Sequence, residues 1–292
     1  MATISPSHPL KILMLHGYTQ SGPLFRAKTR ALEKNLQKAF PAGVTLVYPT
    51  APIHLYKADI PNWDTINSAP ESTAIGPAED EEGTDAWGWW RRKGDAEPYT
   101  YEGMELGFEK IADVLSTEGP FDGIIGFSQG GAAAGMVASL LEPGRRDAFE
   151  KAQPQGGMRY PESFEKDSGF ITDVIHPPFK FVVSYSGFGA STHKLYSAFY
   201  DPKIVTPMLH FIGSVDTVVE EKRSLRLVEA CADGGANGKR VVYHPGGHFV
   251  PSSQKQFVGA LIGFIREVMA ESEPKPKTNN LSGGVEDMDM PF

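Results

Sequence analysis

Residues 121–131, FDGIIGFSQGG, constrain the fold of this chain more than any other stretch. A short β-branched apolar run, typical of a buried strand, leads into Ser128, and a helix of small residues follows. Ser128 lies between Gly126 and Gly130 in a G-x-S-x-G pattern, where any larger side chain would collide with the neighbouring strand and helix. The stretch therefore predicts a strained turn that presents Ser128, as a candidate nucleophile, to the amides of a helix N-terminus.

Strand and helix patterns alternate along the rest of the chain. This alternation predicts an α/β fold with a mostly parallel central sheet and helices on both faces. Besides the strand before Ser128, we expect strands at 11–15, 44–48, 179–185, 206–212 and 240–243. Amphipathic spacing predicts helices at 23–40, 101–118 and 252–270.

A chain of 292 residues with 40% hydrophobic side chains can bury one sizeable core. We expect a single domain over residues 1–271, with irregular insertions at 53–88 and 144–178, the second over the carboxyl edge of the sheet. Residues 272–292 are rich in proline, glycine and acids, which predicts a disordered tail.

Three tryptophans, Trp87, Trp89 and Trp90, close the first insertion. Aromatic side chains at this density either pack beneath the insertion or line a substrate pocket. We favour packing and keep both roles open.

The formal net charge of −8 at pH 7, without a basic cluster, makes nucleic acid an unexpected partner. Cys231 is the single cysteine, which excludes an intramolecular disulfide and a cysteine-rich zinc site and is compatible with a reducing compartment. No apolar run approaches the roughly 18 residues of a membrane span, and the first residues lack a leader-like pattern. We expect a soluble, cytoplasmic protein, with the nucleus as an open alternative.

An acid and a histidine follow Ser128 in the order that a serine triad requires on this fold. Asp216 comes just after the strand at 206–212, and His248 lies in a glycine-bounded loop after the strand at 240–243. Taken singly, Asp216 would more often cap a helix, and His248 would more often be a loop or core histidine. Together with Ser128 at strand ends, they predict a catalytic triad.

Other residues compete for these two roles. His244 is the rival base, but only His248 follows a Gly-Gly pair that lets its loop fold back over Ser128. Asp122 and Asp173 are rival acids, the first at the far end of the strand before Ser128 and the second within the insertion at 144–178. We therefore favour Asp216 and His248.

The polar loop HGYTQSG at 16–22 follows the first expected strand and can reach Ser128, because ligands bind beyond the carboxyl ends of parallel strands. The backbone N–H of Tyr18 or Thr19 could join that of Gln129 in an oxyanion hole. An ordinary turn is the alternative. For His16, before a glycine at a strand end, we favour a structural hydrogen bond to the loop.

Five blocks carry a family resemblance: KILMLHGYTQSG at 11–22, GPFDGIIGFSQGG at 119–131, HPPFKFVVSYSGF at 176–188, TPMLHFIGSVDTVV at 206–219 and HPGGHFVP at 244–251. In their residues and in their order along the chain, these blocks resemble the FSH family of serine hydrolases, which have the α/β-hydrolase fold. The resemblance runs from about residue 10 to 270. It implies Ser128, Asp216 and His248 as the triad and hydrolysis of carboxylic esters or thioesters.

We therefore expect hydrolysis through an acyl-serine, with no metal or organic cofactor. Some members of the resembled family release acyl chains from fungal polyketide synthases, so a dedicated thioesterase acting on a polyketide or fatty acyl carrier protein is the nearest alternative. A non-catalytic module that holds a ligand with Trp87, Trp89 and Trp90 is a further one.

Overall fold

The computed structural model describes residues 8–60, 85–167, 172–190, 192–233 and 240–272. Its centre is a six-stranded sheet, in the order β12-β11-β10-β7-β1-β2, and every neighbouring pair is parallel. The expected parallel sheet is confirmed. The strands are β1 (Leu10–Leu15), β2 (Val44–Val47), β7 (Gly123–Phe127), β10 (Phe181–Tyr185), β11 (Met208–Gly213) and β12 (Val241–His244).

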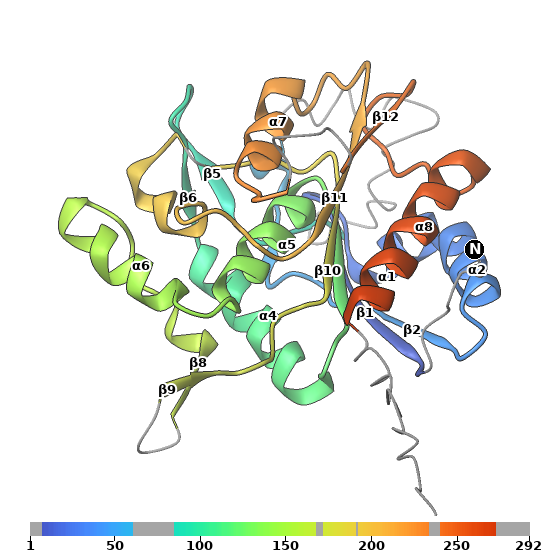
Figure 1. Cartoon of the computed structure of the whole chain (residues 1–292). Helices are drawn as coiled ribbons and strands as arrows, with labels where there is room; N and C mark the ends of the chain where they lie inside the picture. Colours follow the sequence, from blue (N-terminus) through green and yellow to red (C-terminus); the bar gives the residue numbers. More distant parts are fainter. Residues whose placement is uncertain (1–7, 61–84, 168–171, 191, 234–239, 273–292) are drawn as a thin grey trace, which may run out of the picture.

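Helices cover both faces of this sheet, as the sequence predicts (Figure 1). One face carries α4 (Met104–Glu118), α5 (Gln129–Leu140), α6 (Arg145–Ala152) and α7 (Glu221–Glu229). The other carries α1 (Gly22–Lys28), α2 (Arg30–Ala39) and α8 (Lys255–Ser272). Two hydrophobic clusters follow this division, because side chains that alternate along each strand point to opposite faces. No helix in the described ranges is long and apolar enough to cross a membrane.

The region expected as one helix at 23–40 is two helices, so that prediction is wrong in detail. The break falls at Thr29, whose φ of −103° and ψ of 11° leave the helical region. Thr29 Oγ1 donates to the carbonyl of Phe25 at 2.8 Å and contacts Tyr48 Oη at 3.0 Å. A buried threonine that bonds back to its own helix favours such a bend.

The first insertion contributes the strands β3 (Ile53–His54) and β4 (Trp87–Gly88), which pair antiparallel with each other, and the 3₁₀ helix η1 (Lys57–Asp59). Its residues 61–84 lie outside the described part of the chain. A second antiparallel pair, β5 (Arg91–Lys93) with β6 (Thr100–Glu102), follows directly. The predicted disordered tail falls on 273–292, also outside the described residues, although Ser272 still belongs to α8.

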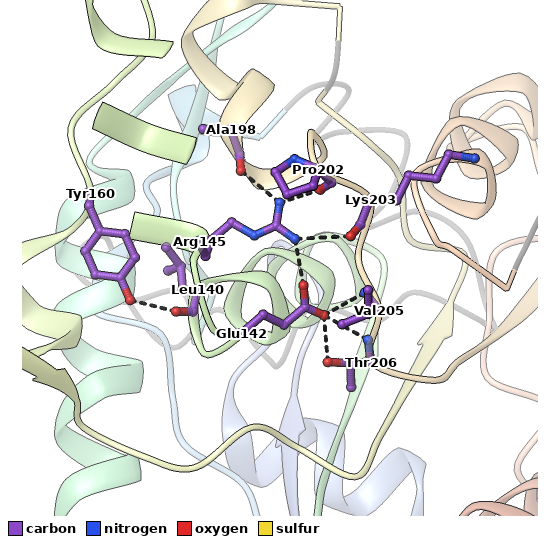
Figure 2. A network of polar contacts seen from close by, with 9 residues as sticks. All are labelled: Leu140, Glu142, Arg145, Tyr160, Ala198, Pro202, Lys203, Val205 and Thr206. Atoms are coloured by element: carbon purple, nitrogen blue, oxygen red, sulfur yellow. Dashed lines mark hydrogen bonds and ion pairs between the residues drawn. The ribbon is translucent and has the colours of Figure 1, made fainter. Parts of the chain in front are cut away.

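The second insertion does not lie over the carboxyl edge of the sheet, contrary to the sequence prediction. Tyr160 Oη donates to the carbonyl of Leu140, at the end of α5 farthest from Ser128, at 2.6 Å (Figure 2). The N–H of Phe121, ahead of β7, donates to His176 Nε2 at 2.7 Å. These contacts place the described part of the insertion along α4 and at the amino edge. It includes η2 (Gln153–Gln155), η3 (Glu162–Phe164), β8 (Glu165–Asp167) and β9 (Thr172–Val174), and η4 (Lys194–Phe199) packs against α6.

Candidate active site

Ser128 lies on the sharp turn between β7 and α5, where the sequence places it. Its φ of 52° and ψ of −116° are a conformation that non-glycine residues rarely adopt. The glycines on either side are required: a Cβ on Gly126 would lie 2.0 Å from the carbonyl oxygen of Gly130, and one on Gly130 would lie 2.2 Å from that of Leu15. The turn therefore presents a strained serine at the carboxyl edge of the sheet.

Asp216 and His248 meet at the same edge. Asp216 Oδ2 lies 2.7 Å from His248 Nδ1, with side chains 2% and 12% exposed. The other carboxylate oxygen, Oδ1, accepts from the N–H groups of Val218 and Val219 at 2.9 Å. One oxygen of Asp216 thus stabilises its own turn, and the other receives the Nδ1–H of the imidazole, which leaves Nε2 as the acceptor nitrogen.

The environment keeps Asp216 ionised. Burial alone would raise the pKa of this carboxyl group, but the hydrogen bond and charge of His248, together with the Val219 N–H, hold it below its usual value. An anionic Asp216 can stabilise an imidazolium at His248, because the two groups share a site largely shielded from water.

Close backbone packing holds the acid loop against the histidine loop. A Cβ on Gly213 would lie 2.5 Å from the carbonyl oxygen of Gly247. The N–H of Ser214 donates to the carbonyl of His244 at 2.8 Å. The Gly-Gly pair that favoured His248 in the sequence therefore lets its loop cross the end of β11 without a side chain between them.

His248 also lies beside the turn that carries Ser128. Its ring centroid is 4.8 Å from that of Phe127, the residue before the serine. Among the described residues, no hydrogen bond joins Ser128 Oγ to His248. Without a bound substrate a nucleophile–base contact is often longer than in the working complex. The arrangement places His248, with Asp216, beside the turn that carries Ser128.

The side chains of the rival residues make other contacts. His244 is buried, packs its ring against Phe249 and Phe257, and accepts from the Gly246 N–H at Nδ1. Asp122 is at the amino edge, where it accepts from the Lys180 ammonium at 2.8 Å. Asp173 belongs to β9, in the insertion at that same edge.

His16 has the structural role favoured for it. Its Nδ1 donates to the carbonyl of Gly17 at 2.7 Å, and its Nε2 accepts from the N–H of Ala51 at 3.0 Å. The side chain is fully buried, which lowers its pKa to about 4 and keeps the ring neutral. A neutral ring with both nitrogens engaged fixes the start of the loop at 16–22.

Of the two candidate partners for Gln129 in an oxyanion hole, Thr19 has a backbone N–H that is already engaged. Its N–H donates to the carbonyl of Trp87 at 2.9 Å and is therefore occupied. Within the described residues, the N–H groups of Tyr18 and Gln129 have no hydrogen-bond partner. Their loops approach closely, since a Cβ on Gly17 would lie 3.3 Å from Ser128 Cβ.

The three tryptophans differ in burial. Trp89 and Trp90 are 0% and 2% exposed and belong to the core on the α5 face, so these two pack rather than line an open pocket. Trp87 is half-buried at the edge of the same cluster. Two open grooves stand out in the described structure, one lined by α1, α2 and β2 and one by α6 and η4, and neither includes Ser128.

Sequence reasoning missed two residues near the site. The side chain of Gln129, considered there only for its backbone, accepts from the Trp89 N–H and donates to the Trp90 carbonyl, both at 2.8 Å. Ser186, at the end of β10 beside β7, has a φ of 48°, and its N–H donates to the carbonyl of Phe211 at 2.8 Å. The Ser-Gly pair after a buried strand was the available signal for Ser186. Nothing local signals the Gln129 contacts.

Comparison with known proteins decides the family. The family model described as "Serine hydrolase (FSH1)" matches residues 4–260. The chain belongs to this serine hydrolase family. It is 31% identical to "Family of serine hydrolases 3" of Saccharomyces cerevisiae, over 91% of this chain and 86% of that protein. It is 32% identical to "Esterase OVCA2" of Danio rerio, over 84% and 92%.

A further relative of this serine hydrolase is longer. The chain is 34% identical, over 94% of its length, to the Schizosaccharomyces pombe protein named "Dihydrofolate reductase", and it spans about half of that protein. Among solved structures, acyl-protein thioesterase 2 of Zea mays is similar over 90% of this chain and 97% of that one, with a TM-score of 0.52 and 19% identity. This structural similarity confirms the α/β-hydrolase fold.

Proposed function

We propose that this serine hydrolase cleaves carboxylic esters or thioesters through an acyl-serine intermediate on a triad of Ser128, His248 and Asp216. The observation that carries the proposal is the 2.7 Å contact between Asp216 Oδ2 and His248 Nδ1, beside the strained turn of Ser128. Family membership supports the reaction class, and the name of the Danio rerio relative, an esterase, supports the substrate class.

In the first half-reaction Ser128 Oγ attacks the carbonyl carbon while His248 Nε2 takes the hydroxyl proton. The tetrahedral intermediate collapses, the bond to the alcohol or thiol breaks, and the imidazolium returns the proton to that leaving group. Water then attacks the acyl-serine with His248 again as the base, which releases the acid and restores Ser128. Asp216 keeps the imidazole in the required tautomer and stabilises its charged form.

Negative charge develops on the carbonyl oxygen during both attacks. The N–H groups of Tyr18 and Gln129 are the donors that we assign to this oxyanion, because they lie near Ser128 and are unoccupied in the described structure. Gln129 is also the first residue of α5, a helix of 12 residues whose positive end favours an anion at that position. The scheme needs no metal or organic cofactor.

A second candidate is a dedicated thioesterase that releases a polyketide or fatty acyl chain, with an acyl carrier protein as partner. The name of the maize structure, an acyl-protein thioesterase, is the observation that favours it. The same triad serves either bond, so leaving-group preference decides between the two candidates.

The test is turnover of p-nitrophenyl esters and matched acyl-thioesters, from acetyl to long chains, by wild type, Ser128→Ala and the control Ser272→Ala in the exposed last turn of α8. We expect turnover by wild type and the control and its loss in Ser128→Ala. Retained turnover in Ser128→Ala would refute the triad. Thioesters turned over far faster than matched esters would favour the thioesterase, and an inert wild type that also resists fluorophosphonate would favour a binding module.

A further inference from the structure

The two N–H groups assigned to the oxyanion hole belong to segments that leave the sheet separately. The pairing of β1 with β7 ends at Leu15 and Gly126, so Tyr18 and Gln129 both lie beyond the last ladder contact. A catalytic constellation works only when its groups are held within about 0.5 Å of the productive geometry. Some structure beyond the sheet must therefore fix the distance between these two donors.

The residues Trp87–Trp90, here the tryptophan segment, hold the first of the two loops. The carbonyl of Trp87 accepts from the Thr19 N–H, and Trp89 Nε1 donates to the carbonyl of His16, both at 2.9 Å. Gly88 lies against the ring of Tyr18, where a Cβ would come within 2.8 Å of Cε2. Contacts with residues before, at and after Tyr18 fix its peptide N–H in place.

The same segment holds the start of α5 through one side chain. Gln129 Oε1 accepts from the Trp89 N–H and Gln129 Nε2 donates to the Trp90 carbonyl, both at 2.8 Å and both buried. Among neutral side chains of this length, a primary amide supplies the donor and the acceptor that this pair of peptide groups requires. Gln129 is 5% exposed, so water cannot replace these bonds without opening the core.

We propose that the Gln129 side chain and the tryptophan segment form a brace that sets the spacing of the two oxyanion donors, with Gln129 and Trp89 as positioning residues. The inference rests on the proposed function, since it assumes the oxyanion hole at Tyr18 and Gln129. It also gives the tryptophan-rich stretch a role that neither simple packing nor a pocket wall supplies. Because oxyanion donors act on the transition state, loosening the brace lowers kcat and leaves KM nearly unchanged.

Two variants loosen the brace from its two sides. Gln129→Met keeps the side-chain length and the backbone N–H but removes both hydrogen bonds of the side-chain amide. Trp89→Phe keeps an aromatic ring in the core but removes the indole N–H that reaches His16. Gln155→Met, on an exposed glutamine of η2 beside α6, is the matched control.

For each variant, kcat and KM are measured with a p-nitrophenyl ester that the wild type hydrolyses. The inhibition constant of a trifluoromethyl ketone is measured as well, because addition of Ser128 converts this ketone into a tetrahedral oxyanion. We expect Gln129→Met to lower kcat 10- to 100-fold with KM within threefold, and to weaken the ketone by the same factor. Trp89→Phe should lower kcat and ketone affinity in the same way, at least threefold. This variant tests the proposal if Gln129→Met does not fold. A structural defect alone would lower the melting temperature without this split.

The brace proposal is overturned if the folded variants keep kcat and ketone affinity within twofold of Gln155→Met, or if KM alone rises. Failure of the proposed function is a separate result. It would appear as turnover that persists in Ser128→Ala, whatever the two brace variants show.

Discussion

A buried ion pair remote from Ser128 allows a stability prediction worked from its contacts (Figure 2). Glu142 Oε2 accepts from Arg145 at 2.6 Å, with side chains 4% and 2% exposed. Glu142 Oε1 accepts three more hydrogen bonds at 2.8 Å, from the Val205 N–H and from the N–H and hydroxyl of Thr206. This carboxylate therefore joins the end of α5 to the segment that enters β11.

Replacing Glu142 by alanine removes the acceptor of those three donors and leaves a buried guanidinium without its carboxylate. We expect the free energy of unfolding to fall by about 3–5 kcal/mol, the range for breaking one partner of a buried pair. Arg145→Met should cost less, about 2–3 kcal/mol, because Glu142 keeps its three donors and the carbonyls of Ala198, Pro202 and Lys203 tolerate a lost donor better.

The assay is equilibrium urea unfolding of wild type, both single variants and the double variant, after refolding has been shown to be reversible. The double variant should lose at least about 1 kcal/mol less than the sum of the singles, because its second change removes a group that the first has already orphaned. Replacing the exposed pair Arg146 and Glu150 is the control, with about 0.5 kcal/mol at most expected. A loss below about 1 kcal/mol for Glu142→Ala, or strictly additive singles, would refute the reasoning.

Three further predictions follow from the site and the core. Asp216→Asn should lower kcat by roughly 10³- to 10⁴-fold with little change in KM, since the amide stabilises the wrong tautomer of His248, and a loss below tenfold in steady-state kinetics would count against the triad. Gly130→Ala should abolish folding or turnover because its Cβ would meet the Leu15 carbonyl. Gly259→Ala, inside α8, should raise the urea midpoint, because its Cβ would meet no side chain or neighbouring element of the described structure within 4 Å and alanine favours a helix over glycine. Burial lowers the pKa of His210 from 6.5 to about 3. Below pH 6.5 the imidazole therefore binds a proton in the unfolded chain but not in the folded chain, and stability is lost as pH falls. Between pH 7 and 5 His210→Leu should lose about 2 kcal/mol less stability than wild type, and equal losses would contradict this.

The parts predicted well from sequence are those that local chemistry determines. A β-branched run with glycines around Ser128 predicts the sharp strand-to-helix turn that the structure has. The Gly-Gly pair before His248 predicts a loop that packs closely against a neighbouring backbone, as it does at Gly213. The parallel direction of the strands follows from the alternation of strand and helix patterns, whereas their order in the sheet comes from the structure alone.

The parts that sequence did not predict depend on contacts between distant residues. Thr19 and Tyr18 are equivalent candidates in the sequence, and a bond to the Trp87 carbonyl, 68 positions away, separates them. The break at Thr29 cannot be seen in the sequence, because the apolar residues of 23–40 keep the spacing of one helical face across it. Nothing in the composition of 144–178 tells which edge of the sheet it covers, which Tyr160 and His176 settle through single hydrogen bonds.

The central claim is that Ser128 is the nucleophile, and covalent labelling tests it most directly. Wild type would be treated with a fluorophosphonate, digested, and its modified peptide mapped by mass spectrometry, with and without a competing ester. The account predicts one adduct, on Ser128, that the ester suppresses and that is absent from Ser128→Ala. An adduct on another residue, or none while ester turnover continues, would contradict it.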